Sequence, residues 1–324
     1  MQAIQLQAFG KAAEVVKLVD VPDVGAPAAD EVVIALEASP INATDLMIIA
    51  GRYGFLPPLP SILGIEGVGR VIAAGKAVKH LKEGDRTLVP MLQPAWTERI
   101  KTNAAWLRPL PQGDLIQFSM LGINPATAYV LLTDIVRLNP GDWIIQNGAN
   151  SATGRAVIAV AKSLGVRTVN VVRRPELVAE IKALGGDLVL VDGPELPKQV
   201  STETGRARIG LALDMVADSS TLNLMNALAE NGIVVVYSAM SGKPLLGSAP
   251  LAIFRNLSIR GFWLFTWYKT ATPEKLVAMY EHLSELMLRG AITAPIAATH
   301  GFDQFGQALA TAAKFSGKVI LKPA

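Results

Sequence analysis

The stretch from Trp143 to Leu164, WIIQNGANSATGRAVIAVAKSL, restricts the fold more than any other part of the chain. It predicts a short apolar strand over 143–145, a turn of small residues from Gly148 to Gly154, and then a helix. This order is typical of a dinucleotide site, because small residues let the backbone approach a pyrophosphate and the helix N-terminus offers free N–H groups. The glycine pattern is incomplete, since Ser151 and Ala152 stand where glycines are usual. An ordinary strand–helix turn is the alternative interpretation.

A second buried strand is predicted over Arg167–Val172, and it ends at Arg173 and Arg174. An NAD site carries an acidic residue at about this distance past the turn, where it binds the ribose hydroxyls. Two arginines suit a 2′-phosphate instead, because guanidinium groups match phosphate oxygens. The sequence therefore favours NADPH, with a solvated basic strand end as the alternative.

The composition excludes several classes of protein. With 51% hydrophobic and 18% charged residues, the 324-residue chain can bury large cores and is not disordered. The net charge is only +3 and no long Lys/Arg cluster occurs, which argues against dedicated nucleic-acid binding. The absence of cysteine excludes disulfides, thiolate zinc sites and cysteine nucleophiles. No apolar run is long enough for a membrane span, and no leader pattern precedes the first strand, so we expect a cytoplasmic protein.

The chain changes character near Leu121. Before that point short strands and proline-rich loops predominate, and after it strands alternate with helices. We therefore expect an α/β protein with a β-rich domain and a doubly wound parallel sheet, whose strand ends at 214–217 and 237–240 line the cofactor crevice. The strands expected in the first part are Ala3–Leu6, Val15–Val19, Glu31–Ser39, Gly67–Ala74 and Arg86–Pro90.

Three local patterns outside the nucleotide stretch leave alternatives open. Tyr53 stands in Gly-Arg-Tyr-Gly, where it either projects from a loop or covers an edge of the core. Glu66 lies among apolar residues and, if buried, is best explained as a structural carboxylate hydrogen-bonded to nearby backbone. Ile259–Leu264 is expected to be a strand whose aromatic residues belong to a core, a subunit edge or the wall of an apolar pocket.

The order of elements resembles the medium-chain dehydrogenase/reductase superfamily over nearly the whole chain. This resemblance implies a GroES-like catalytic domain from 1–121 and 293–324 and a Rossmann cofactor domain from 122–292. Zinc-dependent members carry a cysteine and a histidine as metal ligands where this chain has Thr44 and Ile65. A catalytic zinc is therefore not expected, and the lack of cysteine also removes a structural zinc lobe.

Within that superfamily the chain is similar to the mitochondrial-type 2-enoyl thioester reductases. The matching segments are AGRYGFLPPLP, INPATAYVLL, QNGANSATGRAV, RTVNVVRRPE, IFRNLSIRGFWL and the closing GKVIL. The resemblance implies that NADPH reduces a trans-2,3-enoyl-CoA or enoyl-acyl-carrier-protein, with Tyr53 as catalytic tyrosine and no metal. It implies NADPH contacts at Asn124, Asn150, Ser151, Ala152, Thr153, Arg173, Arg174, Tyr237, Ser238, Ala239, Met240, Phe262, Trp263, Leu264 and Lys318.

The chemistry fits these residues. Hydride addition to C3 of an enoyl thioester leaves negative charge on the thioester oxygen and C2, and a phenol that is protonated at neutral pH can donate to it. Two alternatives remain: an NADPH-dependent quinone or alkenal reductase on the same scaffold, and a non-catalytic NADPH-binding protein. Relatives often dimerise through edge strands of the cofactor domain, so we expect a homodimer joined near 258–264.

Overall fold

The computed structural model describes residues 1–91, 93–314 and 317–323, and the chain in it forms two compact units. Unit 1 comprises Met1–Ile123, Ala271–Leu288 and Thr293–Ala324, and unit 2 comprises Asn124–Thr270 and Arg289–Ile292. The expected division at 121/122 is close to the observed boundary. The helix α11 (Pro273–Leu288), which the sequence assigned to the cofactor domain, instead belongs to unit 1.

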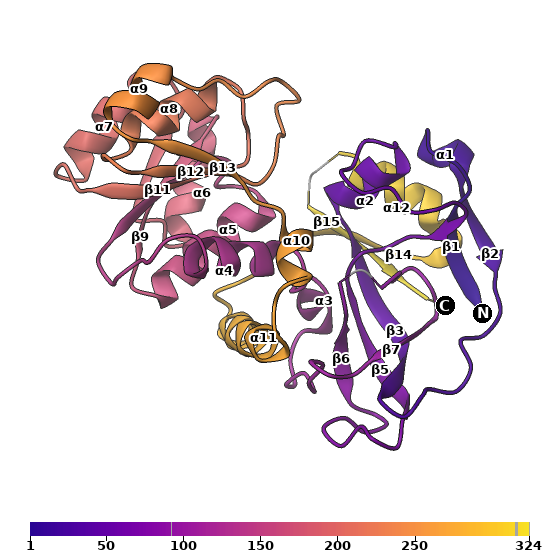
Figure 1. The fold of residues 1–324 in the computed structure, drawn as a ribbon. Helices are drawn as coiled ribbons and strands as arrows, with labels where there is room; N and C mark the ends of the chain where they lie inside the picture. Colours follow the sequence, from indigo (N-terminus) through magenta and orange to yellow (C-terminus); the bar gives the residue numbers. More distant parts are fainter. Residues whose placement is uncertain (92, 315–316, 324) are drawn as a thin grey trace. The chain divides into compact units, whose positions relative to one another are not determined.

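Unit 1 is built from two sheets (Figure 1). The three-stranded sheet has the order β2 (Val16–Asp20), β1 (Gln2–Leu6), β4 (Ser61–Ile62). The larger sheet has the order β14, β15, β3, β5, β6, and β7 also pairs with β3. Its strands are β3 (Glu31–Ile41), β5 (Gly67–Ala74), β6 (Arg86–Val89), β7 (Arg99–Asn103), β14 (Ile296–Gly301) and β15 (Lys318–Lys322).

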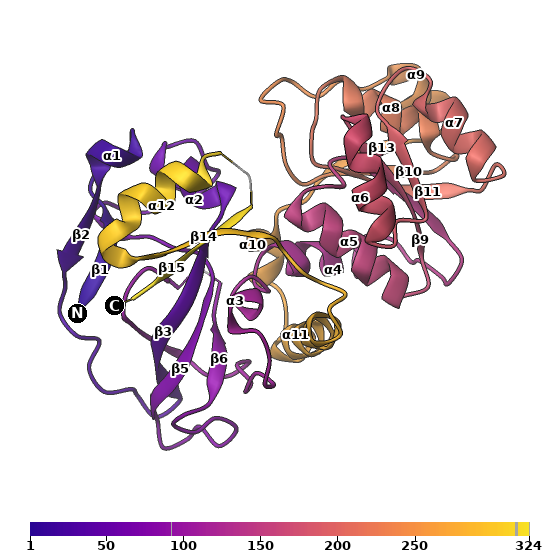
Figure 2. The same ribbon diagram turned by 180° about the vertical axis from the view of Figure 1, so that it is seen from behind.

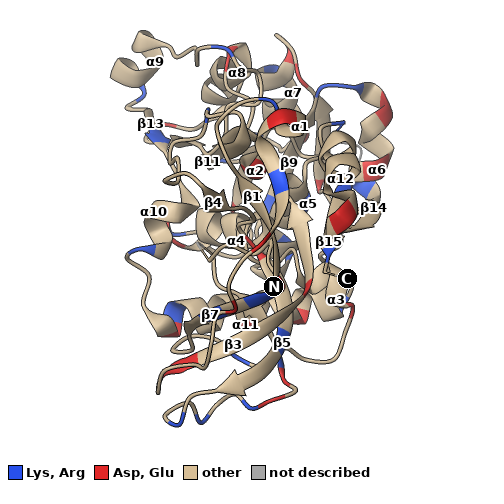
Figure 3. Ribbon diagram, turned by 90° about the vertical axis from the view of Figure 1, so that its right-hand side faces the viewer, with Lys and Arg blue, Asp and Glu red and all other residues tan. Residues whose placement is uncertain are grey.

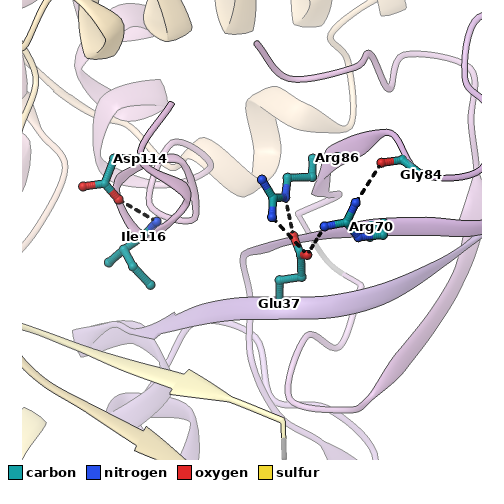
Figure 4. Close-up of polar contacts among 6 residues, drawn as sticks. All are labelled: Glu37, Arg70, Gly84, Arg86, Asp114 and Ile116. Carbon is teal, nitrogen blue, oxygen red and sulfur yellow. Dashed lines mark hydrogen bonds and ion pairs between the residues drawn. The ribbon is translucent and has the colours of Figure 1, made fainter. Parts of the chain in front are cut away.

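Side chains on both faces of these strands hold unit 1 together. Trp96 and Phe302 are buried in its main core, which also takes apolar residues from β1, β3 and β15. On the β3–β5–β6 surface the guanidinium groups of Arg70 and Arg86 both point at the Glu37 carboxylate, at 2.9 and 2.7 Å (Figure 4). These ion pairs cross three neighbouring strands, but their exposure keeps their contribution to stability small.

Short helices complete unit 1. They are α1 (Ala12–Val15), α2 (Ala43–Ile49), α3 (Leu115–Phe118) and α12 (Phe305–Ala312). Helix α3 begins where the Asp114 carboxylate accepts the backbone N–H of Ile116 at 2.9 Å (Figure 4).

Unit 2 contains one six-stranded, wholly parallel sheet. Its order is β10 (Leu188–Val191), β9 (Arg167–Val172), β8 (Trp143–Gln146), β11 (Ile209–Asp214), β12 (Ile233–Val236), β13 (Ser258–Gly261). The chain order reverses direction between β8 and β11, which is the switch point where doubly wound sheets bind nucleotides. The predicted α/β fold with a β-rich part and a doubly wound sheet is confirmed.

Helices connect the strands of unit 2 (Figures 1 and 2). Helix α5 (Ala152–Ser163) contacts both α4 (Asn124–Thr133) and β9, so residues on most of its surface are buried. The others are α6 (Val178–Ala183), α7 (Leu196–Glu203), α8 (Ser219–Ala227), α9 (Ala249–Phe254) and α10 (Leu264–Tyr268). Basic and acidic residues are scattered along the ribbon (Figure 3). No helix of the described residues has both the length and the apolarity to cross a membrane.

One local expectation is wrong. The strand expected over Ile259–Leu264 ends at Gly261, and α10 starts at Leu264, because a short aromatic run satisfies strand and helix patterns equally. Helix α8 is capped by Asp218, whose carboxylate accepts the N–H of Ser220 at 3.0 Å.

Candidate functional site

The turn between β8 and α5 has the geometry of a nucleotide loop. Gly148 has φ +59°, a left-handed conformation that glycine adopts without strain. Ser151 caps α5 by accepting the N–H of Gly154 at 3.0 Å. A Cβ on Gly154 would lie 2.7 Å from the Cα of Ala149, so only glycine permits this close packing. The predicted strand, turn and helix are therefore present, despite the incomplete glycine pattern.

The first turn of α5 fits an anionic group. The first N–H groups of any helix have no partner within it and carry partial positive charge. Thr153 donates from Oγ1 to Asn124 Oδ1 at 3.0 Å, which joins the first turns of α5 and α4. Asn150 is exposed beside this turn. The expected pyrophosphate residues from Asn150 to Thr153 and Asn124 thus lie together in unit 2.

The two arginines expected to bind a 2′-phosphate are exposed directly after β9. Arg174 makes one solvent-exposed ion pair, 3.4 Å from its Nε to Glu176 Oε1. Such pairs contribute little, so the guanidinium group can exchange the carboxylate for a phosphate at small cost. The chain therefore has two cations available where the sequence placed them.

The carboxyl ends of β11 and β12 form the adjoining edge of the sheet. Tyr237, Ser238, Ala239 and Met240 follow β12, and exposure increases from Tyr237 to Met240. The Tyr237 hydroxyl is buried without a hydrogen-bond partner among the described residues. Burial raises the pKa of Tyr237, and the Asp214 carboxylate raises it further, so this phenol stays neutral.

The sequence did not predict a hydrogen-bond network that lies at this edge of the sheet. Asp214 is fully buried, and its Oδ1 accepts Asn147 Nδ2 at 2.7 Å and the backbone N–H groups of Val216 and Ala217 at 2.9 Å. Asn147 Oδ1 in turn accepts the N–H of Met215 at 2.7 Å. These bonds fix the loop after β11. Polar residues at the ends of two neighbouring strands were the only sequence signal for them.

The aromatic segment after β13 is partly covered. The Phe262 N–H donates to Val236 O at 2.9 Å, which extends the pairing with β12 by one residue. The rings of Trp263 and Phe265 stack with centroids 4.7 Å apart, and Leu264 is buried. Phe262 and Trp263 are half-buried, so their apolar surface is only partly used within unit 2.

In unit 1, Tyr53 lies in the loop after α2. Its ring is half-buried and packs against the main core of the unit, while Gly54 and Phe55 beside it are exposed. Both interpretations of this tyrosine are therefore partly correct, since the residue stands in a loop and also covers a core edge.

Unit 1 also contains a buried cluster of ionisable side chains, which includes Glu66 and Lys318. The Asn42 side chain connects them: its Nδ2 donates to Glu66 Oε1 at 2.7 Å, and its Oδ1 accepts Lys318 Nζ. Asp45 Oδ2 accepts the backbone N–H of Asn42 at 2.8 Å and so caps α2 in return. The Lys318 ammonium is thus engaged within unit 1, and its predicted contact with NADPH stays a prediction.

The cluster shifts the pKa of each ionisable member. Burial raises the pKa of Asp45 to about 7, the nearby Glu66 adds to the rise and Lys318 opposes it. Burial likewise raises the pKa of Glu66 against the effect of Lys318. For Lys318 burial lowers the pKa, while Glu66 and Asp45 raise it. Glu66 is buried as expected, but its side chain binds an amide and not only backbone.

This chain has other residue types where related zinc-dependent dehydrogenases carry their metal ligands. Thr44 lies in the first turn of α2, and Ile65 packs against the main core of unit 1. Among the described residues no three His, Cys, Asp or Glu side chains come together as a metal site.

Both halves of the chain match known families. Residues 28–116 match the alcohol dehydrogenase GroES-like domain, and residues 152–282 match the zinc-binding dehydrogenase family. The mitochondrial enoyl-[acyl-carrier-protein] reductase of Homo sapiens is 37% identical over 96% of this chain and 86% of its own length. The corresponding protein of Caenorhabditis elegans is 36% identical over 94% and 90%.

Solved structures give two kinds of neighbour. A candidate NADPH:quinone reductase from Bacillus thuringiensis superposes with a TM-score of 0.90 at 26% identity, covering 100% of this chain and 99% of that one. The mitochondrial 2-enoyl thioester reductase Etr1p/Etr2p heterodimer from Candida tropicalis gives 0.84 at 26%, with 99% of each chain covered. Etr1p in complex with NADP and crotonyl-CoA gives the same TM-score, identity and coverage.

Proposed function

Because this chain belongs to the medium-chain dehydrogenase/reductase superfamily, and within it to the family of the mitochondrial enoyl-[acyl-carrier-protein] reductases, we propose that it uses NADPH to reduce the trans-2,3 double bond of enoyl thioesters. The observation that carries this proposal is the 37% identity with an enoyl reductase over 96% of the chain. The complex of the related Etr1p with NADP and crotonyl-CoA supports the same cofactor and substrate class.

Unit 2 would hold the cofactor. The N-terminus of α5, with Asn150 to Thr153, suits the pyrophosphate, and Arg173 and Arg174 suit the 2′-phosphate. The strand-end segment 237–240 and the aromatic segment 262–264 would enclose the rest of the NADPH molecule. Asn124 would lie beside the turn that precedes α5. When bound, NADPH supplies the hydride that adds to C3.

Tyr53 would supply hydrogen-bonding and proton-donating chemistry. Negative charge develops on the thioester oxygen and C2 during reduction, and a neutral phenol can donate to either. Packing against the core restrains the ring of Tyr53, while its loop leaves the residue only half-buried. With Thr44 and Ile65 in place of metal ligands, we propose that the charge is stabilised without zinc. Dialysis against a chelator should then leave turnover unchanged.

Replacing Tyr53 tests this role. Tyr53→Phe should lower turnover with crotonyl-CoA by an order of magnitude or more, because the ring is retained and only the donor is lost. The dissociation constant for NADPH, measured by fluorescence titration, should not change. Tyr280→Phe, another tyrosine of unit 1, is the matched control and should keep full activity. An unchanged rate in Tyr53→Phe would refute the assignment.

A quinone or alkenal reductase is the second candidate, favoured by the TM-score of 0.90 with the Bacillus thuringiensis protein. Oxidation of NADPH and NADH should be followed with crotonyl-CoA, a longer trans-2-enoyl-CoA and a quinone. Turnover of the enoyl thioesters alone supports the main proposal. Turnover of the quinone alone supports the alternative, and NADPH binding with no turnover would indicate a non-catalytic binding protein.

We also propose a homodimer formed through β13. This strand ends the sheet of unit 2 and its residues are all exposed, so its backbone is open for pairing. Ile259 in it is 39% exposed, and Ile253 and Phe254 before it are 70% and 80% exposed. Light scattering should give twice the chain mass, and Ile259→Lys should reduce it to that of one chain. A cytoplasmic location stays a prediction, because the curated relatives are named as mitochondrial.

A further inference from the structure

The ionic cluster of unit 1 is assembled from separate parts of the chain. Asn42 and Asp45 belong to the start of α2, Glu66 precedes β5, and Lys318 begins β15. Ser39 Oγ donates to the backbone oxygen of Glu66 at 2.6 Å and holds that segment against β3. The fold therefore brings two carboxylates, one amide and one ammonium to a single point.

The cluster contains more buried acceptor oxygens than its own donors satisfy. Asp45 is 0%, Glu66 1% and Asn42 5% exposed. Asp45 Oδ1 and Glu66 Oε2 are buried and make no geometrically formed hydrogen bond among the described residues, although the backbone N–H groups of Gly122 and Ile123 act on the Glu66 carboxylate and lower its pKa. An unsatisfied buried oxygen is costly unless a positive charge lies near it. Carboxylate and amide oxygens are also the donors that hard cations prefer.

The backbone fixes the position of Lys318. Its N–H donates to Pro295 O at 2.8 Å, and β15 pairs with both β14 and β3. Gly317 just before it has φ +152°, and a Cβ there would lie 3.0 Å from the same Pro295 oxygen. The lysine stem thus starts from a constrained strand end, and its Nζ reaches Asn42 Oδ1.

We propose that Asn42, Asp45 and Glu66 form a cation-binding site that the chain fills with its own Lys318 ammonium in place of a free cation. The ligand class of this site is a primary ammonium, which combines a single charge with three N–H donors. The proposal rests on the contacts of unit 1 and does not depend on the proposed reaction.

The test removes the Lys318 ammonium by substitution and then supplies a free alkylammonium ion in the buffer. Lys318→Ala should lower the thermal unfolding temperature by roughly 5 °C or more, because it leaves buried carboxylates without a cation. Ethylammonium chloride should restore at least half of that loss. Tetramethylammonium chloride at equal ionic strength has no N–H donor and should restore none. Equal unfolding temperatures in the two salts, or no loss in Lys318→Ala, would overturn the proposal.

Two further variants keep the test decisive if Lys318→Ala folds poorly. Lys318→Met keeps the stem without the charge, and adding Glu66→Gln to it should recover part of the lost stability. Independent, additive effects of the two substitutions would contradict a shared site. Lys322→Ala is the matched control, because Lys322 is a half-buried lysine at the other end of β15. It should respond equally to both ammonium salts.

Discussion

Each unit buries carboxylates, and the two solve the resulting electrostatic problem differently. In unit 2, Asp214 accepts neutral donors at both oxygens: Asn147 and two backbone N–H groups at Oδ1, and Thr221 Oγ1 at Oδ2, 2.5 Å away. In unit 1, Asp45 and Glu66 keep unpartnered oxygens and lie near an ammonium. A carboxylate that accepts neutral donors at both oxygens stabilises one backbone conformation. A carboxylate balanced by a lysine depends on a charge that a single substitution can remove.

The largest expected effect comes from removing the satisfied carboxylate. Asp214→Ala leaves the buried N–H group of Ala217 and the partly buried N–H group of Val216 without an acceptor, and we expect a loss of about 3–5 kcal/mol in the free energy of unfolding. Urea denaturation measures it. Asp214→Asn retains Oδ1 and should lose much less. Equal losses of unfolding free energy in both variants would show that the negative charge of Asp214, and not its hydrogen bonds, stabilises the protein.

The unit 1 cluster should instead reveal itself through pH. Asp45 has a folded-state pKa of about 7 against an ordinary value of 3.8, so the folded protein holds this proton more tightly than the unfolded chain. The contribution of Asp45 to the free energy of unfolding therefore falls as pH rises from 3.8 to about 7, by up to about 1.4 kcal/mol per pH unit. Above that range this contribution no longer changes with pH.

Comparing wild type with Asp45→Asn isolates this contribution, because Glu66 and Lys318 titrate in the same cluster. Asn at position 45 can still accept the N–H of Asn42 through its amide oxygen. The variant should gain stability relative to wild type as pH increases from 5 to 7, measured by urea denaturation at each pH. A constant difference over that interval would show that Asp45 does not hold its proton in the folded state.

Exposed charges should matter for binding and not for folding. The double substitution Arg173→Ala, Arg174→Ala should weaken NADPH binding about tenfold or more, roughly 1.4 kcal/mol, and leave NADH binding unchanged. Lys182→Ala, an exposed cation of α6, is the control. If NADPH and NADH weaken equally, the two arginines do not recognise the 2′-phosphate.

The smallest effect concerns the backbone beside Asp214. Ala217 has φ +66°, in the left-handed region that costs a residue with a Cβ about 1–2 kcal/mol. Ala217→Gly relieves this strain but increases the freedom of the unfolded chain, so a net gain of less than about 1 kcal/mol is expected. Denaturant titration should show a small stabilisation, and a loss would mean that the Ala217 methyl packs usefully.

The regular parts of the molecule were predictable because they repeat a pattern. Strand β5 and strand β9 have the bounds that alternating or continuous apolar residues suggested, and the turn from Gly148 to Gly154 lies where small residues cluster. Helix α12 and strands β7 and β14 were not predicted. In β14 no residue is fully buried and apolar residues do not alternate with polar ones, so the strand has no sequence signal.

The candidate site was predictable in unit 2 and less so in unit 1. Asn150 to Thr153 and Arg173 follow strand ends in sequence, so topology alone groups them. The cluster of unit 1 joins Asn42 to Lys318 across most of the chain. No local spacing encodes that contact, and the apolar setting of Glu66 signalled only that it needs a partner.

The interleaved course of the chain affects how the protein can be synthesised and cut. Helix α11 belongs to unit 1 but is encoded between two parts of unit 2, and β15 completes the unit 1 sheet from the last residues. During synthesis, the parallel sheet of unit 2 can therefore form before β15, the neighbour of β3 in unit 1, has been made. A fragment spanning 124–292 would carry α11 without the rest of unit 1, and would expose Leu276, Met279 and Leu283, which the whole chain buries.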